Sequence, residues 1–220
     1  KVQSQPPIPQ HMRRVRVALL LASILLIFPM INIVATPQAN EFDYLEEKQY
    51  YSTLDLEDID DLTAVGNTLY FTADDGTNGI ELWKSDGTSA GTVMVKDIRS
   101  GSTSNGFPRS GYPDRLTAFG NTLIFVVEDD THGRELWKSD GTSTGTVMVK
   151  DIRSGSSNPQ ELTVFGNRLY FTATDDTHGR ELWKSDGTST GTVMVKDIWS
   201  GSISSYPSTL TAVGNTLYFT

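Results

Sequence analysis

The sequence predicts an all-β fold built from repeated four-stranded antiparallel sheets, and three observations lead to this prediction. The octapeptide ELWKSDGT occurs three times, at residues 81–88, 135–142 and 181–188. Its tryptophans are 54 and then 46 residues apart, a period typical of repeat architectures. Each repeat also places Gly-Asn and Asp-Gly dipeptides between short apolar runs, as β-hairpins do. The chain has no cysteine, so strand packing must stabilise the sheets without disulfides.

Each repeat divides into four short segments rich in Val, Ile, Thr, Tyr, Phe and Trp, the composition of β-strands. In the first repeat we expect strands at residues 62–65, 68–72, 80–85 and 92–98. Alternation puts Leu69 and Phe71 on one face of the sheet and Tyr70 on the other. Both faces therefore carry bulky apolar groups that must be covered. Radially stacked four-stranded blades meet this need, so the sequence predicts a β-propeller-like array.

The repeat boundaries divide most of the chain into consecutive blades. The first blade is expected at residues 62–115, the second at 116–161 and the third at 162–209, with a truncated fourth blade at 210–220. The first unit is longer because of a Ser-, Gly- and Pro-containing stretch at residues 99–115, where a connector tolerates insertions. Since closed propellers have more blades than this, we expect a fragment of a longer repeat protein.

An acidic segment at residues 40–61 precedes the first blade. Within it, TLDLEDI at residues 53–59 shares Thr, Asp and Ile with TVMVKDI, the fourth strand segment of the first repeat. The match is degenerate, but it stands directly before the first LTAV. We therefore treat residues 53–59 as a candidate strand that closes a ring by pairing with a distant blade.

The N-terminal region has the features of an export signal. Three closely spaced arginines precede an apolar run at residues 17–35, so residues 12–39 are predicted to be a signal peptide or a membrane anchor. Pro29 favours a cleaved leader with a helix over residues 17–29, whereas the length of the run also allows an uncleaved span. Both alternatives keep the arginines inside and direct the repeats outward, to a secreted or cell-surface location. Residues 1–11 are an upstream or disordered segment.

The charge distribution restricts the partners. Residues 36–220 hold all 27 acidic residues but only 14 of the 18 basic residues. An acidic surface repels phosphate backbones, so we expect no nucleic-acid partner. It also disfavours docking on anionic lipid, which leaves a membrane contact only through the N-terminal segment.

The repeat unit is similar to that of the ELWxxDGT-repeat family of bacterial exported proteins, also described as hyalin-like. The similarity covers residues 62–220, and the motif is long enough to be specific. It implies a secreted or surface-attached protein with propeller-like arrays and no assigned activity. The family brings no catalytic residues that could be carried over to this chain.

Four charged positions recur in every repeat and are the first candidates for a site. In the first copy they are Glu81, Lys84, Asp86 and Asp97. Repeated carboxylates could bind calcium through oxygen ligands. The alternative is structural: Asp86 serves the turn before Gly87, and Glu81 pairs with Lys84 across strands. Because the spacing matches neither an EF-hand nor a nonapeptide calcium repeat, we expect no cofactor and keep calcium as the alternative.

The loop before ELW contains a histidine in two of the three repeats. His132 and His178 each follow an acid by two residues, Asp130 and Asp176. Such His–Asp pairs could bind a transition metal or act as a general base. Since the two histidines lie on separate loops, the expected role is a solvent-exposed turn, and no metal site is predicted.

The tryptophans divide into two classes. Trp83, Trp137 and Trp183 could stack on sugar rings, but their position in the middle of a repeated strand predicts a place in the core between blades. Trp199 stands in a connector, where the other copies have Arg99 and Arg153. It is therefore the one candidate for a ligand contact.

The sequence contains no enzyme signature: no nucleophile elbow, no zinc-protease motif and no phosphate loop. Two repeats share an 18-residue stretch without a change, whereas an active site on a propeller recruits different residues from different blades. We therefore expect an exported, non-enzymatic binding scaffold for surface proteins or glycans. The alternative is the propeller portion of an extracellular hydrolase or lyase whose catalytic part lies outside this sequence.

Overall fold

The computed structural model describes residues 56–220. The predicted upstream segment, the signal peptide or anchor with its helix, and most of the acidic segment lie outside these residues. Within residues 56–220 the structure contains β-strands and no helix, so the all-β prediction is confirmed for this part of the chain. No helix described here has the length and apolar character to cross a membrane.

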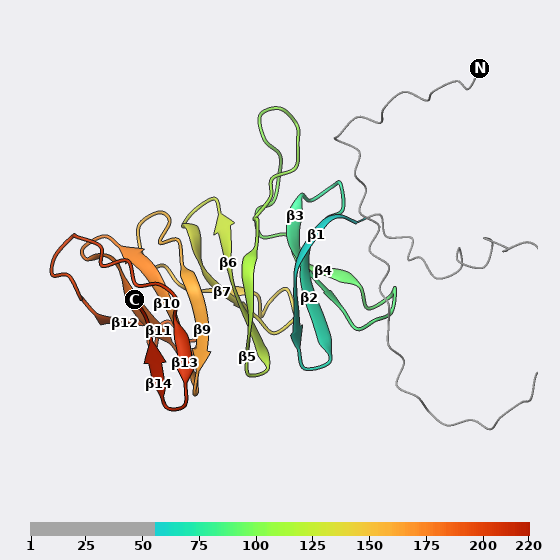
Figure 1. The fold of residues 1–220 in the computed structure, drawn as a ribbon. Helices are drawn as coiled ribbons and strands as arrows, with labels where there is room; N and C mark the ends of the chain where they lie inside the picture. Colours follow the sequence, from blue (N-terminus) through green and yellow to red (C-terminus); the bar gives the residue numbers. More distant parts are fainter. Residues whose placement is uncertain (1–55) are drawn as a thin grey trace, which may run out of the picture.

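Three four-stranded antiparallel sheets follow one another along the chain, and a two-stranded hairpin follows the third (Figure 1). Sheet 1 consists of β1 (Glu57–Val65), β2 (Thr68–Asp74), β3 (Ile80–Ser85) and β4 (Val93–Lys96). Sheet 2 consists of β5 (Asp114–Phe119), β6 (Thr122–Asp129), β7 (Gly133–Ser139) and β8 (Val147–Lys150). Sheet 3 consists of β9 (Gln160–Phe165), β10 (Arg168–Asp175), β11 (Gly179–Ser185) and β12 (Val193–Lys196). The hairpin consists of β13 (Thr211–Val213) and β14 (Thr216–Tyr218).

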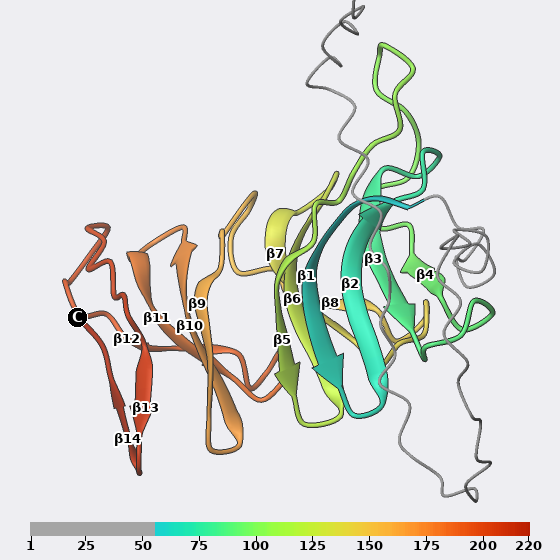
Figure 2. The same ribbon diagram turned by 45° about the vertical axis from the view of Figure 1, so that its right-hand side comes forward.

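The sheets stand side by side, with the first strands of consecutive sheets as neighbours, as both views show (Figures 1 and 2). The Thr63 hydroxyl on β1 donates to the carbonyl oxygen of Leu116 on β5, at 3.1 Å. The Thr163 hydroxyl on β9 makes the same contact with the carbonyl oxygen of Leu210, at 3.4 Å. We call the segments between sheets connectors: the first at residues 97–113, the second at 151–159 and the third at 197–210.

The first strand of each sheet begins earlier than the sequence indicated. In sheet 1, Glu57 pairs with Asp74 and Asp60 with Thr72, because β2 is long enough to need partners upstream of Leu62. Residues 57–59, the end of the candidate ring-closing strand, therefore belong to β1 and do not form a separate strand. Although TLDLEDI resembles the fourth strand segment TVMVKDI, its residues 57–59 lie in a first strand.

A pair of residues with left-handed backbone conformation marks the entry to each first strand. The pairs are Asp58 and Asp61, Tyr112 and Arg115, Asn158 and Glu161, and Tyr206 and Thr209, with φ between 48° and 58°. Bulges interrupt the pairing of the first strands with the second strands in the three sheets. A residue other than glycine or asparagine in this conformation costs about 1–3 kcal/mol, so these entries store strain.

The core lies between the sheets. One cluster joins Tyr70 and Leu82 of sheet 1 to Phe125 and Trp137 of sheet 2. The equivalent cluster joins the opposite face of sheet 2 to sheet 3, including Trp183. Strand β6 is buried at five consecutive residues, so both of its faces are covered, as the sequence predicted. The expected core position between sheets is confirmed for Trp137 and Trp183, while Trp83 is buried in a third cluster on sheet 1.

Candidate functional site

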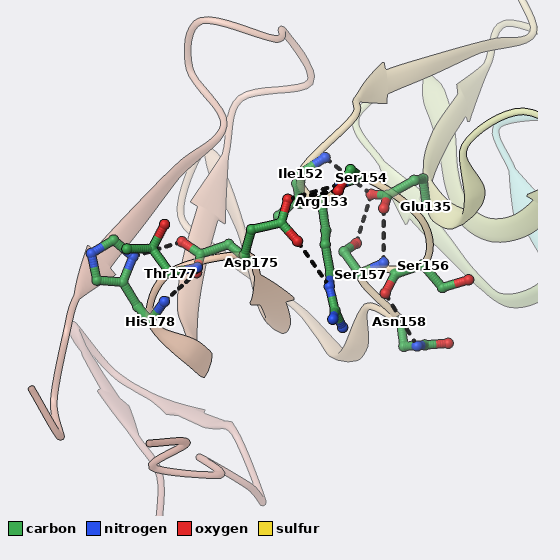
Figure 3. A network of polar contacts seen from close by, with 11 residues as sticks. Glu135, Ile152, Arg153, Ser154, Ser156, Ser157, Asn158, Asp175, Thr177 and His178 are labelled. Carbon is green, nitrogen blue, oxygen red and sulfur yellow. Dashed lines mark hydrogen bonds and ion pairs between the residues drawn. The ribbon is translucent and has the colours of Figure 1, made fainter. Parts of the chain in front are cut away.

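The glutamates of the three ELW motifs, which we call the ELW glutamates (Glu81, Glu135 and Glu181), are completely buried although they are acidic. Glu135 accepts hydrogen bonds from the Ser157 backbone amide at 2.8 Å and from the Ser157 hydroxyl at 2.6 Å (Figure 3). It also accepts one from the Ile152 amide, at 3.4 Å. Ile152 begins the second connector and Ser157 lies near its end, so one carboxylate holds both ends of the segment between two sheets.

The other two ELW glutamates repeat this arrangement. Glu81 accepts from the amides of Ile98 at 3.2 Å and Gly111 at 2.8 Å, at the two ends of the first connector. Glu181 accepts from the Ile198 amide at 3.1 Å, from the Ser205 amide at 2.9 Å and from the Ser205 hydroxyl at 2.6 Å. The contact is therefore a property of the repeat unit.

The expected pair between Glu81 and Lys84 is wrong. Residues three apart on a strand point to opposite faces of the sheet. Glu81 turns toward the first connector, whereas the Lys84 Nζ atom donates to the carbonyl oxygen of Gly141 in the next repeat, at 2.7 Å.

Lysines from two positions of the repeat connect consecutive units. Lys138 continues the pattern of Lys84 by donating to the Gly187 carbonyl oxygen at 2.8 Å. From the fourth strand, Lys96 donates to the Thr146 carbonyl oxygen at 2.8 Å, with its Nζ atom 5.7 Å from the centre of the Trp137 ring. Lys150 donates to the Thr192 carbonyl oxygen at 2.9 Å. These cations are thus engaged by the backbone of the neighbouring unit.

The aspartate of the SDGT segment serves a turn. The Asp86 Oδ1 atom accepts from the Thr88 amide at 2.9 Å and from the Thr88 hydroxyl at 2.7 Å, and Asp140 and Asp186 make the same contacts. The Thr88 hydroxyl in turn accepts from the Gly91 amide. The structural alternative is confirmed for this position.

The histidines pair with a different acid from the one two residues before them. The His132 Nδ1 atom lies 2.8 Å from Asp129, and His178 lies 2.7 Å from Asp175. The hydrogen bond to Asp129 raises the pKa of His132 above its usual value. Asp130 instead pairs with Arg99 of the first connector at 2.8 Å, and Asp176 pairs with Arg153 at 3.1 Å (Figure 3 shows Arg153 and His178). The His–Asp contacts join residues three positions apart in the same loop. The Arg–Asp contacts link a connector to the following sheet.

The structure places Trp199 in the third connector, with 61% of its surface exposed. At the equivalent positions, Arg99 and Arg153 reach the acid of the next sheet. Trp199 therefore occupies a position that, in the other units, contacts the following unit. Its role as a ligand contact stays a prediction.

Among residues 56–220, no three or more His, Asp or Glu side chains are grouped so that they could hold a metal ion. The repeated acids are separated because each makes its own contact: the ELW glutamates with the connectors and the SDGT aspartates with their turns.

Burial and hydrogen bonding have opposite effects on the pKa of Glu81 and of Glu135. Burial raises the pKa of Glu81 to about 7, while the amides of Ile98 and Gly111 act in the opposite direction. Burial likewise raises the pKa of Glu135 to about 7, against the hydrogen bonds from Ser157 and Ile152. Both carboxyls thus titrate in the neutral range, far above the usual pKa of 4.5.

These two shifts predict a chain that is more stable at pH 5 than at pH 8. A carboxyl whose pKa is raised by folding contributes stability that is complete below its unfolded pKa and is lost as the pH rises to the folded value. The window is therefore pH 4.5 to 7, and each group contributes on the order of 3 kcal/mol. The raised pKa of His132 also makes the chain less stable as the pH rises. The contribution of Glu135 is therefore isolated by measuring the denaturant unfolding of Glu135→Gln and of the parent chain across this pH range. The variant should lose part of the pH dependence, and an identical dependence would contradict the assignment.

Sequence reasoning missed the contact between the ELW glutamates and the connectors. The available signal was a charged residue next to Leu-Trp in a segment that is otherwise buried, present in every repeat. A carboxylate in that setting needs buried donors. The donors themselves could not be identified from the sequence, because Gly111, Ser157 and Ser205 lie at different distances along connectors of different length.

No protein-family model matches the chain. No curated protein matches it either. One solved structure with some similarity is the computationally designed Ika8 protein, at 16% sequence identity and a TM-score of 0.38. The similarity covers 74% of this chain and 42% of the designed protein, so the chain spans less than half of that protein's length. At this TM-score the similarity carries no argument about fold or function.

Proposed function

We propose that the chain belongs to an exported or cell-surface repeat protein of the ELWxxDGT type and acts as a non-enzymatic scaffold that binds proteins or glycans. We further propose that its sheets are the blades of a β-propeller-like array. The face-to-face stacking of the sheets and the neighbouring first strands support the second proposal (Figure 2).

The observation that carries the scaffold role is the use made of the repeated polar side chains. The ELW glutamates hold the connectors, two lysine positions hold the next unit, and the SDGT aspartates hold their turns. These repeated groups make contacts that align and connect the units, which supports a structural role for them. What differs from unit to unit is the exposed part of the connectors.

The connectors also carry the exposed aromatic side chains that suit a binding surface. Tyr112 is 52% exposed and Tyr206 68% exposed, and both occupy the strained left-handed position before a proline. Asn158, which tolerates this conformation well, fills the equivalent position in the second connector. Tyrosine stores strain there without contributing to the core, and strained residues cluster at ligand contacts. An exposed ring can stack on a sugar or on a partner side chain.

Replacing these tyrosines separates stability from binding. Tyr112→Gly and Tyr206→Gly should each raise the free energy of unfolding by about 1 kcal/mol, because glycine adopts the left-handed conformation without strain. Both changes should weaken binding of the full chain to a glycan array or to a panel of immobilised secreted proteins. Asn158→Gly is the matched control and should leave binding unchanged. Equal binding by all variants would exclude this surface, and release of reducing ends from a polysaccharide would contradict the non-enzymatic role.

A further inference from the structure

Three arginines, which we call the arginine cluster (Arg115, Arg134 and Arg180), gather where sheets 2 and 3 meet, at the end where the first strands begin. The Asp114 carboxylate pairs with Arg134 at 2.5 Å and with the adjacent Arg115. The Asn158 amide donates to the Arg134 carbonyl oxygen at 3.1 Å. The Asn158 carbonyl oxygen accepts from the Arg180 Nη2 atom at 2.9 Å. The three arginines therefore belong to one chain of contacts.

The positive charge of the cluster is not balanced. Sheet 2 supplies Asp114 to Arg134, but the equivalent residue of sheet 3 is Gln160. Among residues 56–220, Arg180 donates only to uncharged oxygen atoms. Burial and then the positive charge of Arg115 lower the pKa of Arg180, so an anion beside it would stabilise its charged form. Within this part of the chain, three cations thus have one carboxylate as their ion-pair partner.

The backbone at the position of Arg115 does not determine which side chain stands there. It is left-handed in each unit, with four different side chains: Asp61, Arg115, Glu161 and Thr209. Since all four adopt the same strained conformation, the fold does not select the arginine. Strained residues cluster at functional sites, which favours a role in binding for this side chain.

The cluster is accessible and has an aromatic neighbour. The Arg134 side chain is 21% exposed although sheet 3 follows it, and Arg180 occupies the same position of sheet 3. A unit that follows sheet 3 would therefore leave Arg180 within reach of a ligand. Tyr112, which is 52% exposed, lies beside the cluster, because its carbonyl oxygen accepts from the Arg134 Nη1 atom at 3.4 Å. Guanidinium groups beside an exposed ring suit a charged sugar.

We propose that the arginine cluster binds the carboxylates of an acidic glycan, a short oligomer of uronic acid, while Tyr112 stacks on one of its sugar rings. A planar guanidinium group can bind a carboxylate through two parallel hydrogen bonds. A short ligand fits best, because the acidic remainder of the chain repels a long polyanion. This inference rests on the proposed scaffold role and deepens it by naming the class of glycan and the residues that recognise its charge.

The direct test uses a trimer of galacturonic acid, with the uncharged galactose trimer as the reference ligand. In calorimetric titration the full chain should bind the acidic trimer saturably and at least about tenfold more tightly than the reference, which lacks charge-assisted hydrogen bonds. Arg180→Gln should weaken binding of the acidic trimer about tenfold. Arg168→Gln is the matched control, because Arg168 lies at the opposite end of β10 and pairs with Asp186. It should leave the affinity unchanged.

A second variant tests the site without removing an arginine. Gln160→Asp places beside Arg180 the acid that Asp114 supplies to Arg134, so the new carboxylate should compete with the ligand. The affinity for the acidic trimer should fall about tenfold, while the midpoint of denaturant unfolding stays equal or rises. The proposal is wrong if neither Arg180→Gln nor Gln160→Asp weakens binding.

Two further outcomes separate this inference from the scaffold role. The proposal is wrong if a triglutamate peptide binds as tightly as the acidic trimer, since the site would then recognise carboxylates without regard to the sugar. If the chain binds a neutral glycan or a protein, and the arginine variants bind it equally well, the scaffold role stands and this inference fails alone. A chain that binds no glycan and no protein would contradict both.

Discussion

Trp137→Ala should lower the free energy of unfolding by about 3–5 kcal/mol, the range for removal of a large buried aromatic side chain. Trp137 is 8% exposed and fills the space between sheets 1 and 2, against Tyr70 and Leu82. The change also removes the ring under Lys96. Denaturant unfolding of the parent and of Trp137→Ala measures this difference in the free energy of unfolding. The slope of the free energy against denaturant concentration is measured for each chain.

Trp199→Ala is the control for this experiment, because Trp199 is exposed and its loss should change the unfolding free energy by less than about 0.5 kcal/mol. An unchanged midpoint for Trp137→Ala together with lost glycan binding would show that the repeated tryptophan serves recognition. A large drop in midpoint assigns it to packing.

Glu135→Ala should be about as damaging as the tryptophan change, on the order of 3–5 kcal/mol, because it leaves several buried donors without an acceptor. The Ser157 amide, the Ser157 hydroxyl and the Ile152 amide all lose their partner. The second connector should then detach from sheet 2, which hydrogen exchange at Ser157 would report as lost protection.

Glu135→Gln is the matched variant, because the amide oxygen can still accept from the backbone donors. It should cost much less than Glu135→Ala at pH 7. If both variants lost the same free energy, the carboxylate would matter for its charge and the connector contact would be of minor importance.

The sequence was sufficient to predict the strands and the covered faces, and insufficient for the polar contacts. Alternation and turn dipeptides depend on neighbouring residues, so the segments around Leu69 and Trp83 could be assigned as strands from local pattern alone. The start of β1 at Glu57 could not, since the length of a first strand is set by the strand that pairs with it. The first residues of β1 are mostly acidic, and acidic residues are uncommon in strands, so the sequence did not indicate this extension.

The contacts of charged residues depend on distances that the sequence does not contain. Glu135 and Ser157 lie 22 positions apart, and Lys138 and Gly187 lie 49 apart, so only the stacking of the sheets brings them together. The acidic partner of each histidine was predicted wrongly for a different reason. A residue three positions away, Asp129, meets the His132 ring more easily than the nearer Asp130, which turns to the arginine of the preceding connector.

The placement of the ELW glutamates has a consequence for how such a protein can change over time. Glu81 holds the first connector at Ile98 and at Gly111, and Arg99 links its start to Asp130 of the next sheet, so residues near the two ends of the connector align the sheets. The surplus residues of that connector form a small projecting loop, closed by hydrogen bonds between Thr103 and Phe107 (Figure 1). The middle of each connector should therefore tolerate insertions, deletions and grafted loops, because such changes leave the register of every strand unchanged.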